Sequence, residues 1–250
     1  MRFLPVKQGT PEWLQARVGI PTASEFKTAI AVMQKDSPLK DALGRPVRCK
    51  GDPTGEADKY ASDLAIERIS GKPWGEGPNV WMMRRGHELE PAARLAYEGH
   101  SGNMAEEAGV CLTDDGRFGY STDGMVNPIR VPGTDLQLFT GCEGLIEIKC
   151  PVDSQKILGI WTGHDISEYW PQMQGGMWIT GAKWCDFVMY VPELAAAGRD
   201  LYVQRVLRDD NFITDMERRL LAFDKRVAHF VAQLGGAAAN EAAWPFPKAA

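Results

Sequence analysis

Residues 145–149 combine strand-like alternation with an acid and a lysine, Glu147 and Lys149, two positions apart. Side chains at positions i and i+2 of a strand leave the same face, so these two point together while the isoleucines at 146 and 148 face a core. A second acid, Asp123, precedes this segment. Carboxylates of this kind hold a hard divalent cation, and a lysine beside them steadies an attacking water or an anionic transition state. This combination is what metal-assisted phosphodiester hydrolysis requires.

Each of these residues also has a structural interpretation. Asp123 stands before Gly124, and Asp-Gly is a common turn pair. Glu147 would be costly to bury alone, but it could lie on an edge strand or be paired only with Lys149. Lys149 could be a surface lysine whose stem covers apolar neighbours. The presence of Glu147 and Lys149 downstream favours a metal-ligand role for Asp123.

Composition sets broad limits on the class of protein. The chain has 250 residues, a net charge of −5 and five scattered cysteines without a CxxC pair, which argues against a zinc or iron–sulfur site. No apolar run approaches the roughly 20 residues of a membrane span, and the first residues do not form a signal peptide. We therefore expect a cytoplasmic α/β protein without a membrane segment. The charge disfavours a passive nucleic-acid coat protein, although it allows an acidic site within a local basic groove.

Hydrophobic periodicity predicts the order of the helices and strands. We expect two short helices within 9–31, divided at 19–21, with Thr22 as the N-cap of the second and Glu25 completing a capping box. Further helices are expected at 56–70, 78–99, 166–180 and 211–234, and strands at 109–113, 118–122, 144–150, 184–191 and 201–207. Residues 32–56 are expected to be irregular, and 124–144 to form a long turn-rich connection. The pattern indicates one domain over 1–234 and a flexible tail over 235–250.

This order, together with five sequence segments, resembles the PD-(D/E)xK nuclease superfamily, and within it the lambda-type phage exonucleases and YqaJ-like viral recombinases. The segments are Gly9-Thr10-Pro11-Glu12-Trp13 with Arg17-Val18-Gly19-Ile20-Pro21-Thr22-Ala23-Ser24; Arg85-Gly86-His87-Glu88-Leu89-Glu90-Pro91-Ala92-Ala93-Arg94; Ser121-Thr122-Asp123-Gly124; Leu145-Ile146-Glu147-Ile148-Lys149-Cys150-Pro151; and Tyr169-Trp170-Pro171-Gln172-Met173-Gln174 with Met177-Trp178. The resemblance implies an α/β fold with a central mixed β-sheet flanked by α-helices.

The resemblance also assigns further site residues. It makes Glu90 a helix-borne acid at the metal, with Glu88 as its nearest rival, although Glu90 could simply pair with Arg94 one turn later. It makes the carbonyl of Ile148 a further oxygen ligand beside Asp123 and Glu147. Gln172 would meet the substrate or orient the lysine; the alternative is a glutamine on an exposed helix face.

Arg17 and Ser24 complete the expected site. Ser24 falls in the first turn of a predicted helix, where free N–H groups favour a phosphate, and Arg17 could contact that phosphate with two hydrogen bonds. The alternative is a capping serine and a surface arginine. The resemblance favours a pocket for the 5′-terminal phosphate of DNA. The basic segment 33–50 could face DNA as well, although such mixed charge runs are usually just solvated.

The expected activity is a Mg²⁺-dependent (with Mn²⁺ as a substitute) 5′→3′ exonuclease that acts on double-stranded DNA ends and releases 5′-mononucleotides. By resemblance, the remaining 3′ strand would pass to a single-strand annealing protein, and a homotrimer ring is plausible. Two alternatives stay open: a structure-specific endonuclease or nickase of the same fold, and a catalytically silent DNA-end-binding module. No GxSxG segment, Walker loop or histidine spacing for a metal occurs in the sequence, which argues against serine hydrolases, NTPases and zinc enzymes.

Overall fold

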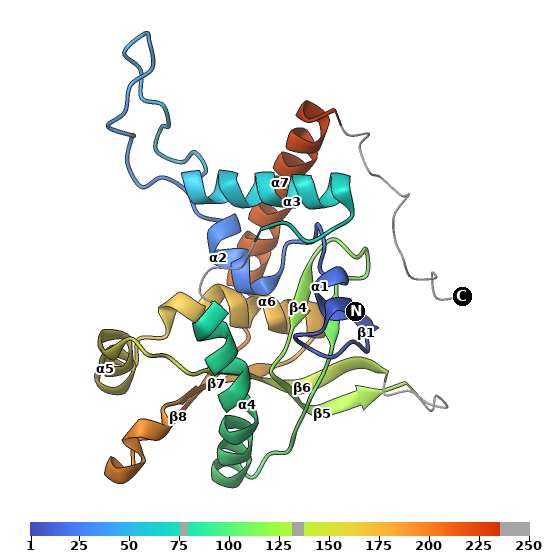
Figure 1. Ribbon diagram of the computed structural model, residues 1–250, viewed down its shortest axis with the longest axis vertical. Helices are drawn as coiled ribbons and strands as arrows, with labels where there is room; N and C mark the ends of the chain where they lie inside the picture. Colours follow the sequence, from blue (N-terminus) through green and yellow to red (C-terminus); the bar gives the residue numbers. More distant parts are fainter. Residues whose placement is uncertain (76–79, 132–137, 236–250) are drawn as a thin grey trace.

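Two β-sheets organise the computed structural model, which describes residues 1–75, 80–131 and 138–235 (Figure 1). The main sheet has the strand order β2-β5-β6-β7-β8, and its members are β2 (Ala105–Glu106), β5 (Gly124–Arg130), β6 (Phe139–Lys149), β7 (Trp184–Tyr190) and β8 (Leu201–Leu207). Strands β6 and β7 are parallel and the other neighbours antiparallel, so the sheet is mixed, as predicted. A smaller antiparallel sheet contains β1 (Arg2–Leu4), β3 (Val110–Leu112) and β4 (Gly119–Ser121).

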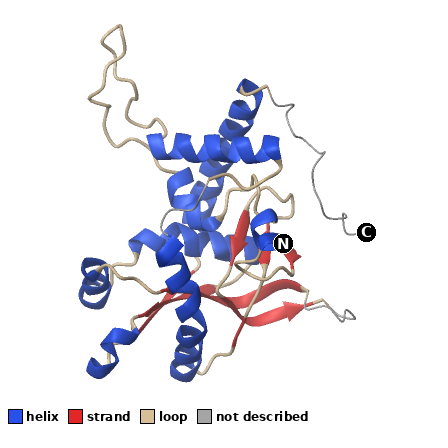
Figure 2. Ribbon diagram, in the orientation of Figure 1, coloured by secondary structure: helices blue, strands red, loops and turns tan. Residues whose placement is uncertain are grey.

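Helices cover both faces of the main sheet (Figure 2). The α-helices are α1 (Pro11–Gln15), α2 (Phe26–Ala29), α3 (Gly55–Ser70), α4 (Val80–Ser101), α5 (Ser154–Gly163), α6 (Trp170–Thr180) and α7 (Asp210–Gln233). Helix α6 packs on one face, backed by α7, while α4 contacts β6, β7 and β8 from the other. Helix α7 follows its predicted range because its buried side chains recur three or four residues apart along one stripe.

Strand β6 separates two hydrophobic cores. Leu145 belongs to the larger core with α6 and α7, whereas Ile146 and Ile148 join Ala93 and Tyr97 of α4 in a second core. The predicted alternation is therefore confirmed: the isoleucines face a core, and Glu147 leaves the opposite face.

Two expectations about local structure are wrong. The stretch 124–144 is not a connection: most of it forms β5 and the first half of β6, which pair as antiparallel neighbours. The sequence does not predict this hairpin, because β5 contains poor strand formers such as Asn127 and Pro128, whose strand conformation depends on the partner strand. The expected capping box is also absent: the 3₁₀ turn Ala23–Glu25 begins without a side-chain cap from Thr22, whose hydroxyl instead binds Arg17.

Three elements of the structure, β1, β2 and α5, have no counterpart among the predicted helices and strands. Helix α5 begins where the side chain of Asp153 accepts hydrogen bonds from the N–H groups of Gln155 and Lys156. The expected tail, beyond Gly235, lies outside the described residues. Residues 32–54 are irregular as predicted and form an extended arm closed by the isolated pairings Val32–Pro53 and Lys40–Pro46 (Figure 1, upper left). None of the described helices could span a membrane.

Candidate active site

Glu147 lies at the centre of a buried polar cluster formed by β4, β6 and α6. Its side chain is almost completely buried, with the residue only 1% exposed. The ammonium of Lys149 donates to Glu147 Oε1 over 2.6 Å, and Gln172 Nε2 donates to the same oxygen over 2.5 Å. The hydroxyl of Tyr120 donates to Glu147 Oε2 over 3.3 Å. Gln172 is thus not on an exposed helix face, and Glu147 is not paired with Lys149 alone.

Asp123 joins this cluster from the junction between β4 and β5. Its Oδ2 accepts a hydrogen bond from the Ile148 N–H over 2.7 Å, which fixes the carboxylate beside the C-terminal end of β6. The turn is stabilised separately, since the hydroxyl of Thr122 accepts from the Gly124 N–H. The side chain of Gln8 lies near Asp123 and lowers the pKa of its carboxyl group, an effect that the sequence did not reveal. Asp123 thus stands at a turn, as the structural interpretation expected, and also belongs to the buried polar cluster; its role as a metal ligand stays a prediction.

Glu90 approaches Asp123 from the opposite side of β6, because α4 covers the other face of the sheet. It pairs with Arg94 over 3.0 Å, as the surface interpretation expected, but its side chain is only 17% exposed. Its rival Glu88 is 68% exposed and lies near Arg84 instead. Glu90 and Thr122, the residue before Asp123, line the same cavity, and repulsion from Asp123 contributes to the raised pKa of Glu90. Glu90 is therefore the better placed of the two to be the helix-borne acid, and its role at a metal stays a prediction.

The electrostatics of the three acids match an all-oxygen cation site. Burial, and then repulsion from Asp123, raises the pKa of both Glu90 and Glu147 to about 7. Burial also raises the pKa of Asp123. Burial alone would lower the pKa of Lys149, but the carboxylates of Glu147 and Asp123 raise it, so the lysine is charged. Because like charges held together in a buried site are relieved by a cation, this donor set fits a hard divalent ion.

The acid side chains do not, however, form a complete metal-binding site as they stand. Within the described part of the chain, no three acid, histidine or cysteine side chains stand close enough together to hold a metal as they are. Glu90 and Glu147 reach Asp123 from opposite sides of β6, and Lys149 and Gln172 occupy one oxygen of Glu147. The structure places the N–H of Ile148 at Asp123, and the ligand role of the Ile148 carbonyl stays a prediction.

Arg17 anchors a second polar cluster next to the acids. Its guanidinium donates to Ser121 Oγ and to Thr22 Oγ1, each over 2.9 Å, and stacks on the ring of Trp13. Thr22 Oγ1 lies 3.3 Å from Ser24 Oγ, so the predicted pair Arg17 and Ser24 meets through the threonine. Ser121 precedes Asp123 by two residues, so this cluster adjoins the acids. Arg17 is therefore not a free surface arginine.

Sequence reasoning missed three members of this cluster: Trp13, Thr22 as a direct partner of Arg17, and Ser121. The indole N–H of Trp13 donates to Ser121 Oγ over 2.8 Å, so the serine hydroxyl is approached by both the ring and the guanidinium. Both Trp13 and Ser121 lie inside the segments that carried the family resemblance. Their roles could have been suspected there, but only folding shows that residues more than one hundred positions apart meet.

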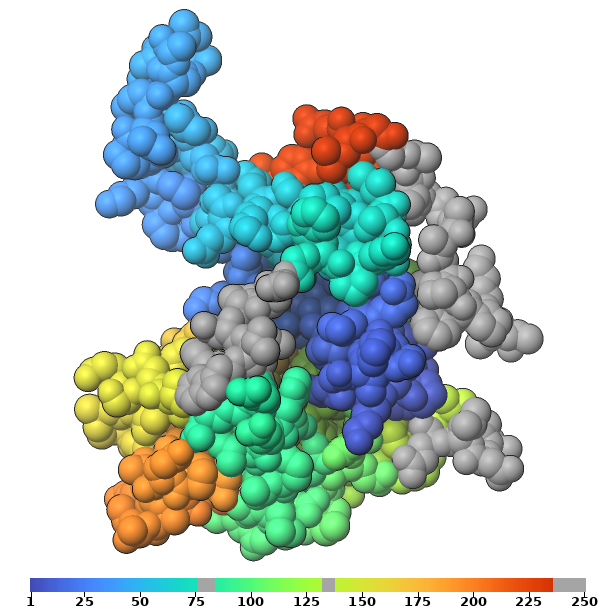
Figure 3. All heavy atoms as spheres, viewed as in Figure 1, coloured from blue at the N-terminus to red at the C-terminus, as the bar shows by residue number. Residues whose placement is uncertain are grey.

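A cavity of about 580 Å³ opens beside Glu90. Its wall includes Lys7 and Gln8 from the N-terminal segment, and His87, Glu90 and Arg94 from α4. Figure 3 shows the dark blue N-terminal segment next to the green α4 on this side of the molecule. Because Gln8 also lies near Asp123, the cavity adjoins the cluster of acids.

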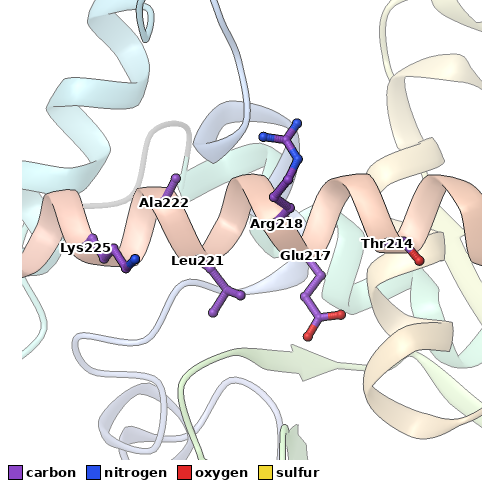
Figure 4. A pocket seen from close by; sticks show the side chains of 6 residues that line it. All are labelled: Thr214, Glu217, Arg218, Leu221, Ala222 and Lys225. Carbon is purple, nitrogen blue, oxygen red and sulfur yellow. The ribbon is translucent and has the colours of Figure 1, made fainter.

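A second hollow lies on the outer face of α7 and shares no residue with the acids (Figure 4). It is lined by Thr214, Glu217, Arg218, Leu221, Ala222 and Lys225. All six come from a single helix, so this hollow brings no residues together from different parts of the chain.

The raised pKa values predict a pH-dependent effect of metal on stability. The pKa of Glu90 and Glu147 is about 7 in the folded protein and near 4.5 in the unfolded chain, so the folded state holds more protons between these values. The free energy of unfolding of the metal-free protein should therefore fall as the pH rises from about 4.5 toward 7. Mg²⁺ binds the ionised acids, so it should raise the melting temperature more at about pH 8 than at about pH 6. Thermal unfolding with and without MgCl₂ measures this; equal gains at both pH values would contradict it.

Comparison with known proteins places the chain in a family. The model of the YqaJ-like viral recombinase domain matches residues 12–183. The chain belongs to the YqaJ-like viral recombinase family. No curated protein matches at a significant level.

Solved structures agree with this family and its fold. An alkaline exonuclease from Laribacter hongkongensis is 30% identical, with a TM-score of 0.69 over 90% of this chain and 96% of that chain. The same enzyme in complex with dAMP matches equally well. A phage-related exonuclease from Haemophilus somnus 129PT, 16% identical with a TM-score of 0.58 over 86% of this chain and 96% of that one, shares the fold. This YqaJ-family chain thus has the PD-(D/E)xK nuclease fold, as the sequence segments predicted.

Proposed function

We propose that this YqaJ-family chain is a Mg²⁺-dependent 5′→3′ exonuclease that digests one strand of duplex DNA from its end and releases 5′-mononucleotides. The proposal rests on one observation: the Arg17 cluster and the cluster of acids lie next to each other at the end of β4. Ser121 belongs to the Arg17 cluster, and Asp123, two residues later, belongs to the acids. An anion site held at this short distance from a hydrolytic site suits a substrate with a terminal phosphate.

The acids Asp123, Glu147 and Glu90, with the carbonyl of Ile148, would hold the metal; Mn²⁺ should substitute, because oxygen ligands suit both ions. When bound, Mg²⁺ supplies a Lewis acid that activates water and neutralises charge on the leaving oxygen. Lys149, oriented by Glu147, directs its ammonium toward the water or the phosphate that is attacked. Gln172 keeps Glu147 in place through its hydrogen bond to Oε1.

Arg17 and Ser24 would bind the 5′-terminal phosphate. A guanidinium binds a phosphate through paired, charge-assisted hydrogen bonds, and its two present acceptors are neutral hydroxyl groups. A phosphate therefore meets no competing carboxylate among the hydrogen-bond partners of this arginine. With the terminal phosphate fixed there, the chain could cut at the next phosphate and then advance by one nucleotide.

The dAMP complex of the Laribacter hongkongensis exonuclease supports a mononucleotide as the product. We further infer a single nuclease domain over residues 1–234, a cytoplasmic location, and a supply of 3′ single strands to an annealing protein in phage-type recombination. A homotrimer ring around DNA is the assembly that the family resemblance favours.

The proposal is tested with linear and closed circular duplex DNA of the same sequence in Mg²⁺. We expect 5′-mononucleotides from the linear substrate, no cutting of the circle, and neither reaction without a divalent ion. Cutting of circles and linear DNA at equal rates would favour the endonuclease alternative. Binding to DNA ends without cleavage under several divalent ions would favour the silent end-binding module.

A further inference from the structure

A buried hydrogen-bond network joins α4 to the main sheet two turns away from Glu90. Tyr97 of α4 is fully buried, and its hydroxyl donates to Asp186 Oδ2 of β7 over 2.8 Å. Arg205 of β8 holds both oxygens of Asp186, with Nε and Nη2 each at 2.8 Å. The guanidinium of Arg205 also lies 3.7 Å from the centre of the Trp184 ring. Asp186, held by Arg205, thus fixes the position of one tyrosine hydroxyl.

The network requires a protonated hydroxyl group at position 97. Burial, and then the hydrogen bond to Asp186, raises the pKa of Tyr97 to about 12, so the hydroxyl keeps its proton and remains a donor. Asp186 is only 2% exposed, and a buried carboxylate is tolerated when its charge and lone pairs are satisfied. Asn103 donates to the same hydroxyl over 3.2 Å, which completes its hydrogen bonding.

Glu90 and Tyr97 lie on the same face of α4, because residues seven apart in a helix are nearly aligned. Ala93, between them, is fully buried in the same core as Tyr97. Rotation or sliding of α4 would therefore displace Glu90 and Tyr97 together. Asp186, the partner of Tyr97 in the sheet, also lies near the site, since it pairs in register with Ile146, which precedes Glu147.

The helix itself is weakened where Glu90 stands. Pro91 lies inside α4 and cannot donate the backbone hydrogen bond that would reach the carbonyl of His87. The turn that carries Glu90 thus depends more on contacts outside the helix than an uninterrupted turn would.

We propose that Tyr97 is a positioning residue for Glu90. The hydrogen bond from its hydroxyl to Asp186, backed by Arg205, sets the position of α4 along its axis and the rotation of the helix. It thereby places the Glu90 carboxylate beside Asp123. The inference rests on the proposed role of Glu90 at the metal. A purely structural tyrosine would affect stability alone, whereas a positioning tyrosine affects metal affinity through Glu90.

The test is Tyr97→Phe, which removes only the hydroxyl. Binding of Mn²⁺ to the protein without DNA, followed by the electron paramagnetic resonance signal of free Mn²⁺, should weaken by about 3- to 10-fold, as expected for the loss of one hydrogen bond. The Mg²⁺ concentration for half-maximal cleavage should rise by a similar factor, with the rate at saturating Mg²⁺ within about twofold of wild type. Unchanged Mn²⁺ affinity would overturn the inference.

The matched control is Tyr202→Phe. Tyr202 lies on the edge strand β8, and its hydroxyl is hydrogen-bonded to Gln204 and His164. This substitution should leave Mn²⁺ affinity unchanged. In a Glu90→Gln background, Tyr97→Phe should cause no further weakening, because both changes act through one carboxylate. Additive losses, or a Glu90→Gln variant that binds Mn²⁺ like wild type, would overturn the inference.

If Tyr97→Phe fails to fold, Asn103→Ala removes one partner of the hydroxyl and should weaken Mn²⁺ binding in the same direction by less; no change there would count against the inference. If the wild-type protein binds Mn²⁺ but cleaves no DNA, the proposed function is wrong. The Mn²⁺ affinities of wild type and Tyr97→Phe still decide the role of Tyr97. A wild type that binds no Mn²⁺ overturns both.

Discussion

Replacing Lys149 by alanine should lower the rate of DNA cleavage by about 10²–10³-fold, the usual loss when one charged or hydrogen-bonding group that stabilises the transition state is removed. The ammonium lies 2.6 Å from Glu147 and is kept charged by the surrounding carboxylates. Its loss would also leave Glu147 and Asp123 with less compensating charge, so the pKa of both acids should rise further. The rate at saturating Mg²⁺ and its pH profile measure the two effects, and the profile should move to higher pH.

The matched control is Lys156→Ala. Lys156 of α5 lies over the same ring of Tyr169 as Lys149 but pairs with Glu168 instead of Glu147. It should reduce the cleavage rate by much less than the Lys149 substitution. Binding to DNA ends in Ca²⁺ should persist in both variants. A Lys149→Ala protein that kept more than about a tenth of the wild-type rate would remove this lysine from the proposed mechanism.

Replacing Arg17 by alanine should reduce the preference for a 5′-phosphorylated end over a 5′-hydroxyl end by about 10- to 100-fold, the worth of a hydrogen bond to a charged group. The physical reason is the loss of the guanidinium that faces Ser121 and Thr22. Ser24→Ala should act in the same direction but less strongly, because its hydroxyl is neutral. The ratio of initial rates on the two kinds of end measures the effect.

Arg84→Ala is the control for this second prediction, since Arg84 is an exposed arginine of α4 whose ion pair with Glu88 lies apart from the Arg17 cluster. It should leave the ratio unchanged. If Arg17→Ala lowers the rates on both ends equally, the arginine stabilises the fold or binds DNA in general, and the 5′-phosphate pocket must lie elsewhere.

The two clusters suggest how direction and chemistry are divided. In the proposed mechanism, the acids with Lys149 would hydrolyse any phosphodiester that reaches them, so they would not by themselves distinguish an exonuclease from an endonuclease. The Arg17 cluster would supply that distinction by holding a terminal phosphate. The two substitutions therefore test different parts of the proposal, chemistry in one case and choice of substrate end in the other.

The sequence by itself determined the core of the candidate site. Strand pleating is a local property, so the spacing of Glu147 and Lys149 required a shared face, and the alternating isoleucines required a core on the other side. Helices with a clear apolar stripe, such as α7, could be predicted for the same reason. The hairpin of β5 and β6 could not, because glycine, asparagine and proline form a strand only when a partner strand holds them.

Only the tertiary structure decided which distant residues meet. Local periodicity does not show that Glu90 is buried toward Asp123 while Glu88 is exposed, or that the N–H of Ile148 binds Asp123. Nor does it show that Gln172 reaches Glu147, or that Ser121 lies against Arg17. These contacts join segments separated by 25 to more than 100 residues, and their geometry is set by how α4, α6 and the two sheets pack. The sequence determined which groups could do the chemistry, and packing decided which of them meet, since side chains converge only after both cores have formed.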